Sequence, residues 1–327
     1  MKIGMNTDGF GSLGLDECLS KAAALGMRCV EFGMGGWSAA PHISIDELLS
    51  ETTARDRLMG KLREHNLEIS ALNCSGNQLH PGETGSNDTD LAYKTVELAS
   101  LLGIGRIVMM SGLPGAPGDN YPNWITSSWP LEAIEILEWQ WSERVIPWWK
   151  SFAPKAEAKG IRVCVEQHGR QVVYNTESFF RLRDVVGPTV GVNFDPSHLI
   201  WMGGDPASAI RALGDCIYHV HGKDSRIEPA AKVNGLLDTK HVTPVRPRFW
   251  NFVSLGHGSS VRAWLDIVRA LREVGYDDVI SIENEDYSLI ADDAVATSVS
   301  TLQFCISHCE NDPIKPSVPR DEWAKNL

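Results

Sequence analysis

The sequence predicts an α/β fold in which eight parallel strands close into one barrel surrounded by helices. Eight short apolar runs alternate with helical patterns along the chain, and a glycine often ends the helical pattern just before the next strand. Continuous β-branched runs are typical of parallel strands that are buried on both faces. An open doubly wound sheet would need about five or six strands, whereas eight is the number that closes a barrel.

The expected elements follow one another regularly. The strands are expected at residues 2–6, 28–32, 68–73, 106–111, 162–167, 189–195, 217–221 and 279–283. Apolar residues recur at spacings of three and four in the segments between them, which predicts helices, for example at 16–27, 90–103, 176–187 and 261–275. The glycines expected to end helices are Gly26, Gly103, Gly160, Gly187, Gly214 and Gly275.

Two connections are longer than usual, and both follow strands at the end of a barrel where active sites lie. Residues 112–131 follow the fourth strand and residues 223–258 follow the seventh. Long loops without periodicity of their own are often functional lids. We expect one catalytic barrel domain over residues 1–310. The proline-containing segment 311–327 should be an extended arm, either packed on a neighbouring subunit or disordered.

Composition limits the classes of partner. The net charge of −12 argues against a nucleic acid or an anionic membrane. The seven cysteines are an odd number without the spacing of a disulfide framework, which suits a reducing compartment. The N-terminus shows no signal sequence, and no run of about 18 apolar residues could span a membrane. We therefore expect a soluble, cytoplasmic protein that acts on a small molecule.

Four acidic or imidazole side chains each close a different expected strand. They are Glu166, Asp195, His221 and Glu283. Side chains at the carboxyl ends of barrel strands converge, and a set of carboxylates with one imidazole suits Mn²⁺, Mg²⁺ or a similar ion.

Two of these four residues have a neighbour of the same type that could take their place. His219 and His221 share one face of a strand, so either could be the ligand, and Glu285 competes in the same way with Glu283. We prefer His221 because it lies nearer the end of its strand, and Glu283 because it lies deeper.

The motifs FDPSHL, HGKD and IENED, which contain Asp195, His221 and Glu283, carry a family resemblance. The chain resembles the xylose-isomerase-like barrels, which include sugar isomerases, sugar epimerases and related carbohydrate enzymes, over nearly its whole length. This resemblance implies one divalent ion, most often Mn²⁺, with Mg²⁺, Co²⁺ or Zn²⁺ as alternatives. Its ligands would be Glu166, Asp195, His221 and Glu283. His198 of FDPSHL would lie beside the metal or the substrate.

Other polar residues are candidates for contact with the substrate. His168 lies two residues past Glu166, where it could shuttle a proton or simply bond to the barrel rim. We expect Lys223 of HGKD to bind substrate. After the third strand, polar residues could read sugar hydroxyls, although ordinary loop polarity would explain them equally well; they are Asn73, Gln78 and His80. Asn6 and Glu31 close strands one and two and are weaker candidates.

Six of the eleven tryptophans lie between residues 124 and 149. Trp124 and Trp129, in the loop after strand four, are expected to form a pocket wall, because aromatic rings stack on sugar faces and on aryl groups. The other four are expected to pack in the core from a helix at 138–150, with Trp141, Val145 and Trp148 against the barrel.

Phosphate recognition has little support, because no P-loop pattern occurs. The basic residues of the second long connection either meet an anion or cover a solvated lid; they are Lys232, Lys240, Arg246 and Arg248. We therefore expect an unphosphorylated sugar or glycoside.

The chemistry that the resemblance implies is removal of a proton next to a carbonyl, with a metal ion stabilising the enediolate. Glu166 and Glu283 would flank the substrate carbon, one removing the proton and the other returning it, as isomerisation or epimerisation requires. The same enolate could instead expel a β leaving group. Catalytic subunits of C-glycoside deglycosidases do this to 3-keto-glycosides with a small partner subunit, so either a homo-oligomer or such a complex is expected.

Two remoter alternatives belong to other classes. An endonuclease-IV-type repair enzyme shares this barrel but needs about three Zn²⁺ ions, more histidine ligands and a basic face for the phosphate backbone, which the charge of −12 disfavours. A non-catalytic sugar-binding barrel would show no dependence on metal.

Overall fold

The computed structural model describes residues 1–243, 245–310 and 312, and it confirms the predicted barrel. Eight parallel strands follow one another around the closed barrel in the order β1-β10-β7-β6-β5-β4-β3-β2. Their bounds are β1 (Lys2–Asn6), β2 (Cys29–Gly33), β3 (Glu68–Asn73), β4 (Arg106–Met110), β5 (Arg162–Glu166), β6 (Val190–Phe194), β7 (Ile217–Gly222) and β10 (Val279–Ile282). Each lies within one residue of the expected strand at either end.

The chain divides into two compact units. The first comprises Met1–Glu31, Gly60–Ser70 and Asn193–Leu327, and the second comprises Phe32–Met59 and Ala71–Val192. The proposed arm at 311–327 lies outside the described residues, apart from Asp312.

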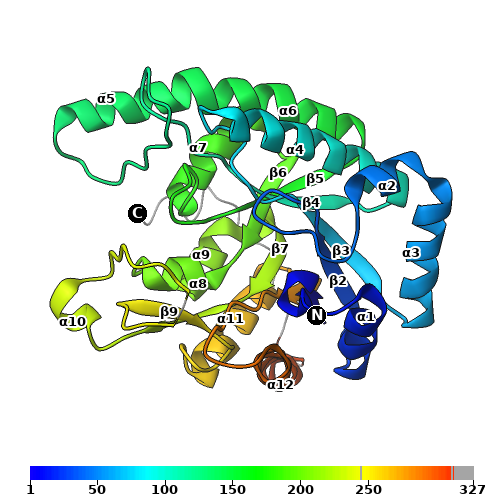
Figure 1. The fold of residues 1–327 in the computed structure, drawn as a ribbon. Coiled ribbons are helices and arrows are strands. Elements are labelled where there is room, and N and C mark those ends of the chain that lie inside the picture. Colours follow the sequence, from blue (N-terminus) through cyan, green and yellow to red (C-terminus); the bar gives the residue numbers. More distant parts are fainter. Residues whose placement is uncertain (244, 311, 313–327) are drawn as a thin grey trace. The chain divides into compact units, whose positions relative to one another are not determined.

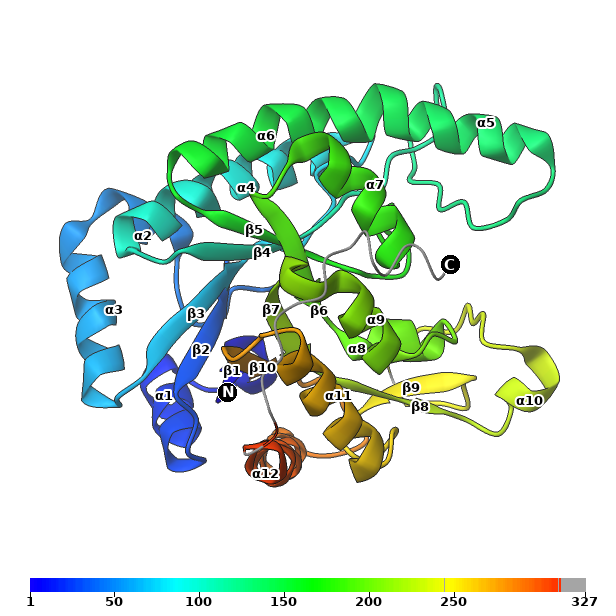
Figure 2. The same cartoon turned by 180° about the vertical axis from the view of Figure 1, so that it is seen from behind.

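In the first unit, β1 pairs in parallel with both β2 and β10, and β10 pairs with β7, where Ser281 stands opposite His221. Helix α11 packs against both α9 and α12, and Figures 1 and 2 both show α11 beside α12. Besides the short α10 (Ala231–Asn234), the helices and turns of this unit are η1 (Thr7–Phe10), α1 (Leu15–Ala24), α8 (Pro196–Trp201), α9 (Pro206–Leu213), η3 (Gly214–Cys216), α11 (Val261–Glu273) and α12 (Ala291–Cys309). Helix α3 (Thr52–Glu64) begins in the second unit and ends in the first.

In the second unit, β4 pairs with β3 and β5. The helices are α2 (Ile45–Ser50), α4 (Glu83–Leu102), α5 (Leu131–Trp139), α6 (Ile146–Ala158) and α7 (Thr176–Val186). A π-helical turn, η2 (Gln140–Val145), joins α5 to α6, so the helix expected at 138–150 is longer than predicted. Trp141 and Trp149 are 2% and 0% exposed, which confirms core packing for these two. Trp139 and Trp148 are half-buried, and Trp148 stacks on Phe152.

The predicted helix-ending glycines all have positive φ, between 55° and 83°. At the end of α4, for example, Gly103 (φ 69°) donates its N–H to the carbonyl of Ala99. A residue with a Cβ is strained in this left-handed conformation, which explains why glycine marks the change from helix to strand.

The two long connections differ from each other. Residues 111–130 contain no helix or strand, as expected, and the buried side chain of Gln140 holds them by donating to the carbonyls of Pro114 (3.0 Å) and Asn123 (2.8 Å). The second connection was expected to lack structure, and this expectation is wrong. It contains an antiparallel hairpin of β8 (Asp224–Ile227) and β9 (Trp250–Val253), with α10 (Ala231–Asn234) between them. β8 (DSRI) and β9 (WNFV) lack the continuous β-branched run by which the barrel strands were predicted.

Asp224 anchors this hairpin to α11. Its buried carboxylate accepts hydrogen bonds from the backbone N–H of Gly256 (3.1 Å) and Ser259 (2.9 Å) and from Nε1 of Trp264 (3.0 Å). Burial raises the pKa of Asp224, although these hydrogen bonds oppose the shift.

The seven cysteines are buried thiols. Within the described part of the chain, no helix combines the length and hydropathy that crossing a membrane requires.

Candidate active site

In the first unit, three of the predicted ligands lie at the ends of β6, β7 and β10. Asp195 follows β6 and caps α8, because its Oδ1 accepts from the N–H of Ser197 at 2.8 Å and Pro196 begins the helix. This capping bond holds Oδ1, while Oδ2 lies 3.1 Å from Nζ of Lys223. His221 lies in β7, and Glu283 directly follows β10.

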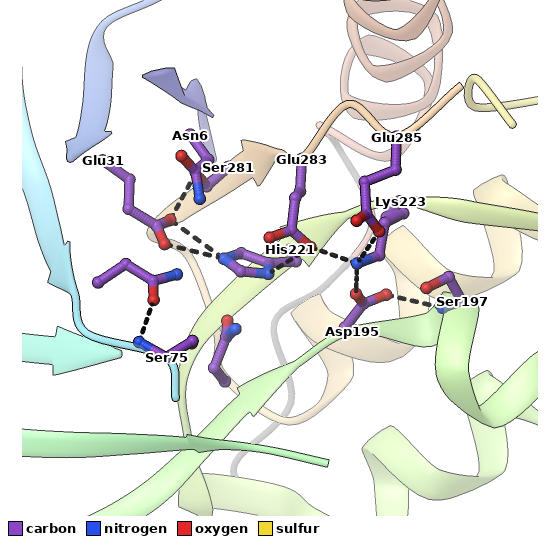
Figure 3. Close-up of polar contacts among 12 residues, drawn as sticks. Asn6, Glu31, Ser75, Asp195, Ser197, His221, Lys223, Ser281, Glu283 and Glu285 are labelled. Carbon is purple, nitrogen blue, oxygen red and sulfur yellow. Dashed lines mark hydrogen bonds and ion pairs between the residues drawn. The ribbon is translucent and has the colours of Figure 1, made fainter. Parts of the chain in front are cut away.

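These three side chains converge, as Figure 3 shows. Asp195, His221 and Glu283 each offer a ligand atom within 4.8 Å of the others, and Nδ1 of His221 lies 3.3 Å from Oε2 of Glu283. Asp195 and His221 are 1% and 0% exposed, and the side chain of Glu283 is 21% exposed. A small cation could therefore reach the carboxylate of Glu283 from solvent.

Lys223 lies among these carboxylates. Its Nζ is 3.1 Å from Oδ2 of Asp195 and 3.0 Å from Oε2 of Glu285, and it also contacts Oε2 of Glu283. The residue is 3% exposed, and its ammonium lies 4.8 Å from the ring centroid of Phe252. The ammonium offsets part of the negative charge gathered here, which burial would otherwise make costly. Glu283 approaches both His221 and Lys223, so it is better placed as a ligand than Glu285.

His198 lies one turn along α8 from Asp195 and is 1% exposed. Its Nε2 lies 3.4 Å from Oδ2 of Asp195, and its ring meets Phe252 edge-on with 5.5 Å between centroids. Since the same aromatic ring borders Lys223, His198 and Lys223 belong to one cluster with Asp195.

Glu31 is the residue that sequence reasoning undervalued. It is fully buried in the middle of β2, and its two carboxylate oxygens lie 3.0 and 3.1 Å from Nε2 of His221. Ser281 donates its hydroxyl to Oε2 of Glu31 at 2.8 Å. The sequence predicted Glu31 to close its strand, but β2 continues for two more residues. The partner of Glu31, 190 residues away, was not visible in the sequence.

His219, the alternative to His221, is also fully buried. Its Nδ1 lies 2.9 Å from Oδ1 of Asn193, and its Nε2 lies 3.6 Å from Oε2 of Glu31. His219 therefore points to a side chain of β6 on one side and to Glu31 on the other.

In the second unit, Glu166 ends β5 and is 1% exposed. His168 follows in the next turn, is half-buried, contacts the carbonyl of Gly169 and packs on Trp37 with 5.4 Å between ring centroids. The assignments of Glu166 as a ligand and of His168 as a substrate contact remain predictions.

The polar residues after β3 bond to the backbone of their own unit. Oδ1 of Asn73 accepts from the N–H of Ser75 (2.9 Å), Nε2 of Gln78 donates to the carbonyl of Met110 (2.8 Å), and Nδ1 of His80 accepts from the N–H of Gly82 (2.9 Å). Their predicted role in reading sugar hydroxyls is untested, but each has a structural partner.

The two loop tryptophans lie in different surroundings. Trp124 is half-buried and meets Tyr174 edge-on with 5.7 Å between centroids, whereas Trp129 is 74% exposed. Trp124 is therefore better placed than Trp129 to form part of a pocket wall.

Comparison with known proteins identifies the family. A family model described as "Xylose isomerase-like TIM barrel" matches residues 19–305. The chain belongs to this family. It is 46% identical to the uncharacterized protein YfiH of Bacillus subtilis, over 94% of this chain and 100% of that protein. It is also 29% identical to an inosose isomerase of Bacillus velezensis, over 46% of this chain and 51% of that enzyme.

A solved structure with the same xylose isomerase-like fold is titled as the IOLI protein with a binding zinc atom. It is 21% identical, has a TM-score of 0.66, and the match covers 94% of this chain and 99% of that chain. The donor set of Asp195, His221 and Glu283, two carboxylates and one imidazole, is the kind that Mn²⁺ and Zn²⁺ accept. The residues present therefore fit a divalent ion, while the identity of the ion is open.

Proposed function

We propose that this protein is a divalent-metal-dependent enzyme that removes a proton next to the carbonyl of an unphosphorylated sugar, with isomerisation or epimerisation as the outcome. The convergence of Asp195, His221 and Glu283 at adjoining strand ends carries the proposal. Family membership supports a sugar substrate, since one relative is named as an inosose isomerase.

We assign Glu166 as the fourth ligand. It ends β5, which neighbours the β6 strand that precedes Asp195 in the barrel order, and it is almost fully buried. When bound, the ion would supply a Lewis acid that polarises the sugar carbonyl. Mn²⁺ is our first expectation, with Mg²⁺, Co²⁺ and Zn²⁺ as alternatives.

The remaining chemistry belongs to the side chains. Glu283 is one of the two proposed proton carriers, because its carboxylate is partly exposed while Lys223 and His221 hold it in place. Glu166 is the other, with His168 nearby in sequence to bind a sugar hydroxyl. The ammonium of Lys223 can donate a hydrogen bond to a substrate oxygen, and His198 can do so beside Asp195.

The preference for an unphosphorylated substrate is supported by the β8–β9 connection. Two of its basic side chains are drawn to one carboxylate: Lys240 lies 2.9 Å and Arg248 4.0 Å from Asp238. The guanidinium of Arg248 also covers the ring of Trp250 at 4.5 Å. Both cations therefore contribute to the internal structure of this connection.

Proton exchange with solvent tests the proposed chemistry. The Mn²⁺-loaded protein should transfer deuterium from D₂O to the α-carbon of a ketose or a 3-keto-glycoside, as followed by ¹H NMR. Glu283→Gln should abolish this exchange. The matched control Glu285→Gln removes a carboxylate that also contacts Lys223 and should retain most of it.

The products distinguish the possible outcomes. An isomerase or epimerase returns a sugar of unchanged composition, whereas elimination releases an aglycone and leaves an unsaturated keto-sugar. If no candidate substrate exchanges a proton under any metal loading, the proposed mechanism is wrong.

A further inference from the structure

A buried chain of contacts continues from the candidate metal ligands toward β2. The two nitrogens of the His221 ring face different carboxylates: Nδ1 lies 3.3 Å from Glu283, and Nε2 lies 3.0 and 3.1 Å from the two oxygens of Glu31. Both His221 and Glu31 are 0% exposed. The ring thus stands between a carboxylate at the candidate metal site and one behind it, as Figure 3 shows.

The chemistry of the two partners determines which nitrogen carries the hydrogen. A carboxylate accepts hydrogen bonds, so the short contacts of Glu31 place the hydrogen of a neutral ring on Nε2. The lone pair then lies on Nδ1, the nitrogen that faces Glu283. A histidine that binds metal commonly donates its other N–H to a carboxylate, which fixes both the tautomer and the orientation of the ring.

Glu31 is itself held in place. The hydroxyl of Ser281, opposite His221 in the pairing of β10 with β7, donates to Oε2 of Glu31 at 2.8 Å. A fully buried carboxylate is costly without such donors. The contacts from Ser281 and His221 therefore allow Glu31 to remain in this position.

We propose that Glu31 is a positioning residue that fixes the tautomer and orientation of His221, so that Nδ1 is the nitrogen presented to the ion. This inference rests on the proposed metal-dependent function. Glu31 acts through His221 and makes no contact with the ion itself. A competing arrangement would use Glu31, His219 and His221 as direct ligands, since these three also offer atoms within 4.8 Å of one another.

The test measures Zn²⁺ affinity by competition with a chromophoric chelator in the wild-type protein and in five variants, one of which is the ligand variant Glu283→Gln. Glu31→Ala leaves Nε2–H without its acceptor and should weaken binding by about 10- to 100-fold. Glu31→Gln keeps an oxygen acceptor of nearly the same shape and should recover most of the affinity. Ser281→Ala removes only the support behind Glu31 and should cost less than Glu31→Ala. His219→Ala should retain the ion.

A second readout observes the ring directly. Long-range ¹H–¹⁵N correlation spectra of histidine-labelled, Zn²⁺-loaded protein should show His221 with its hydrogen on Nε2 in the wild type. The Glu31→Ala spectrum should show a shift toward the Nδ1–H tautomer. An Nδ1–H ring in the wild type would overturn the inference, even if every Glu31 variant failed to fold.

The possible failures can be told apart. If the wild type binds no divalent ion, the proposed function is wrong. If the wild type binds Zn²⁺ and Glu31→Ala binds it equally tightly with an unchanged tautomer, Glu31 does not position His221. If His219→Ala abolishes binding while Glu283→Gln does not, Glu31 and His219 are direct ligands and the positioning role is refuted.

Discussion

Two groups of polar residues follow barrel strands in this protein, and they use their side chains differently. The first group follows β6, β7 and β10, where Asp195, His221 and Glu283 turn toward one another and toward Lys223. The second group follows β3, where Asn77 and Gln78 bond to backbone groups of the β4 end and the loop after it. Both groups are largely buried and both come from strand ends.

The difference lies in what the side chains can bind. In the first group the side chains contact one another, so their oxygens and nitrogens converge on a small volume that a cation could share. In the second group amide side chains satisfy buried N–H and C=O groups, which would be costly to leave unpaired. Side chains that converge on one another therefore indicate a site of binding or catalysis, whereas side chains that bond to backbone groups indicate a structural role.

The largest expected effect falls on the first group. His198→Ala should lower turnover by about 10²- to 10⁴-fold if the imidazole meets substrate beside Asp195. The thermal midpoint should shift by only a few degrees if the side chain serves the substrate rather than the fold. Steady-state kinetics and thermal melts would be measured together. If stability collapses while turnover per folded molecule is preserved, His198 supports the fold and does not act on the substrate.

The second group should respond in the opposite way. Asn77→Ala should lower the free energy of unfolding by about 2–3 kcal/mol, because it leaves buried backbone groups of Leu113 without partners. The side chain of Asn77 accepts from the N–H of Leu113 at 2.8 Å and donates to its carbonyl at 3.0 Å. Urea denaturation measures the loss. Metal affinity should be unchanged. A large change in metal affinity would show that the group after β3 is not purely structural.

Features that depend on residues close together in the sequence could be predicted, whereas features that depend on contacts between distant segments could not. Strands and helix ends were predicted well, because β-branched runs and glycines such as Gly103 act within a few residues. The group of Asp195, His221 and Glu283 was predicted because parallel strands share one edge of the barrel. Glu31 was ranked low because its importance depends on a contact with His221 from a distant strand. The sequence also could not reveal whether the amide of Gln78 bonds to backbone or substrate.

The smallest expected effect concerns Trp129. Its side chain is 74% exposed, so Trp129→Ala should change stability by less than about 0.5 kcal/mol. The turnover of free sugars should also be unchanged. Trp124→Ala, at the half-buried position beside Tyr174, is the matched comparison and should cost more stability. If Trp129→Ala selectively weakens aryl glycosides, this tryptophan contacts an aglycone despite its exposure.

We propose above all that the side chains at the ends of β6, β7 and β10 hold one divalent ion. The direct test is the number of tightly bound metal ions per chain, measured by elemental analysis after loading and desalting, in the wild type, Glu283→Gln, His221→Ala and Asn77→Ala. We expect one ion per chain in the wild type and in Asn77→Ala, and near-complete loss in the other two. Full retention of the ion in both Glu283→Gln and His221→Ala would contradict this assignment of the ligands.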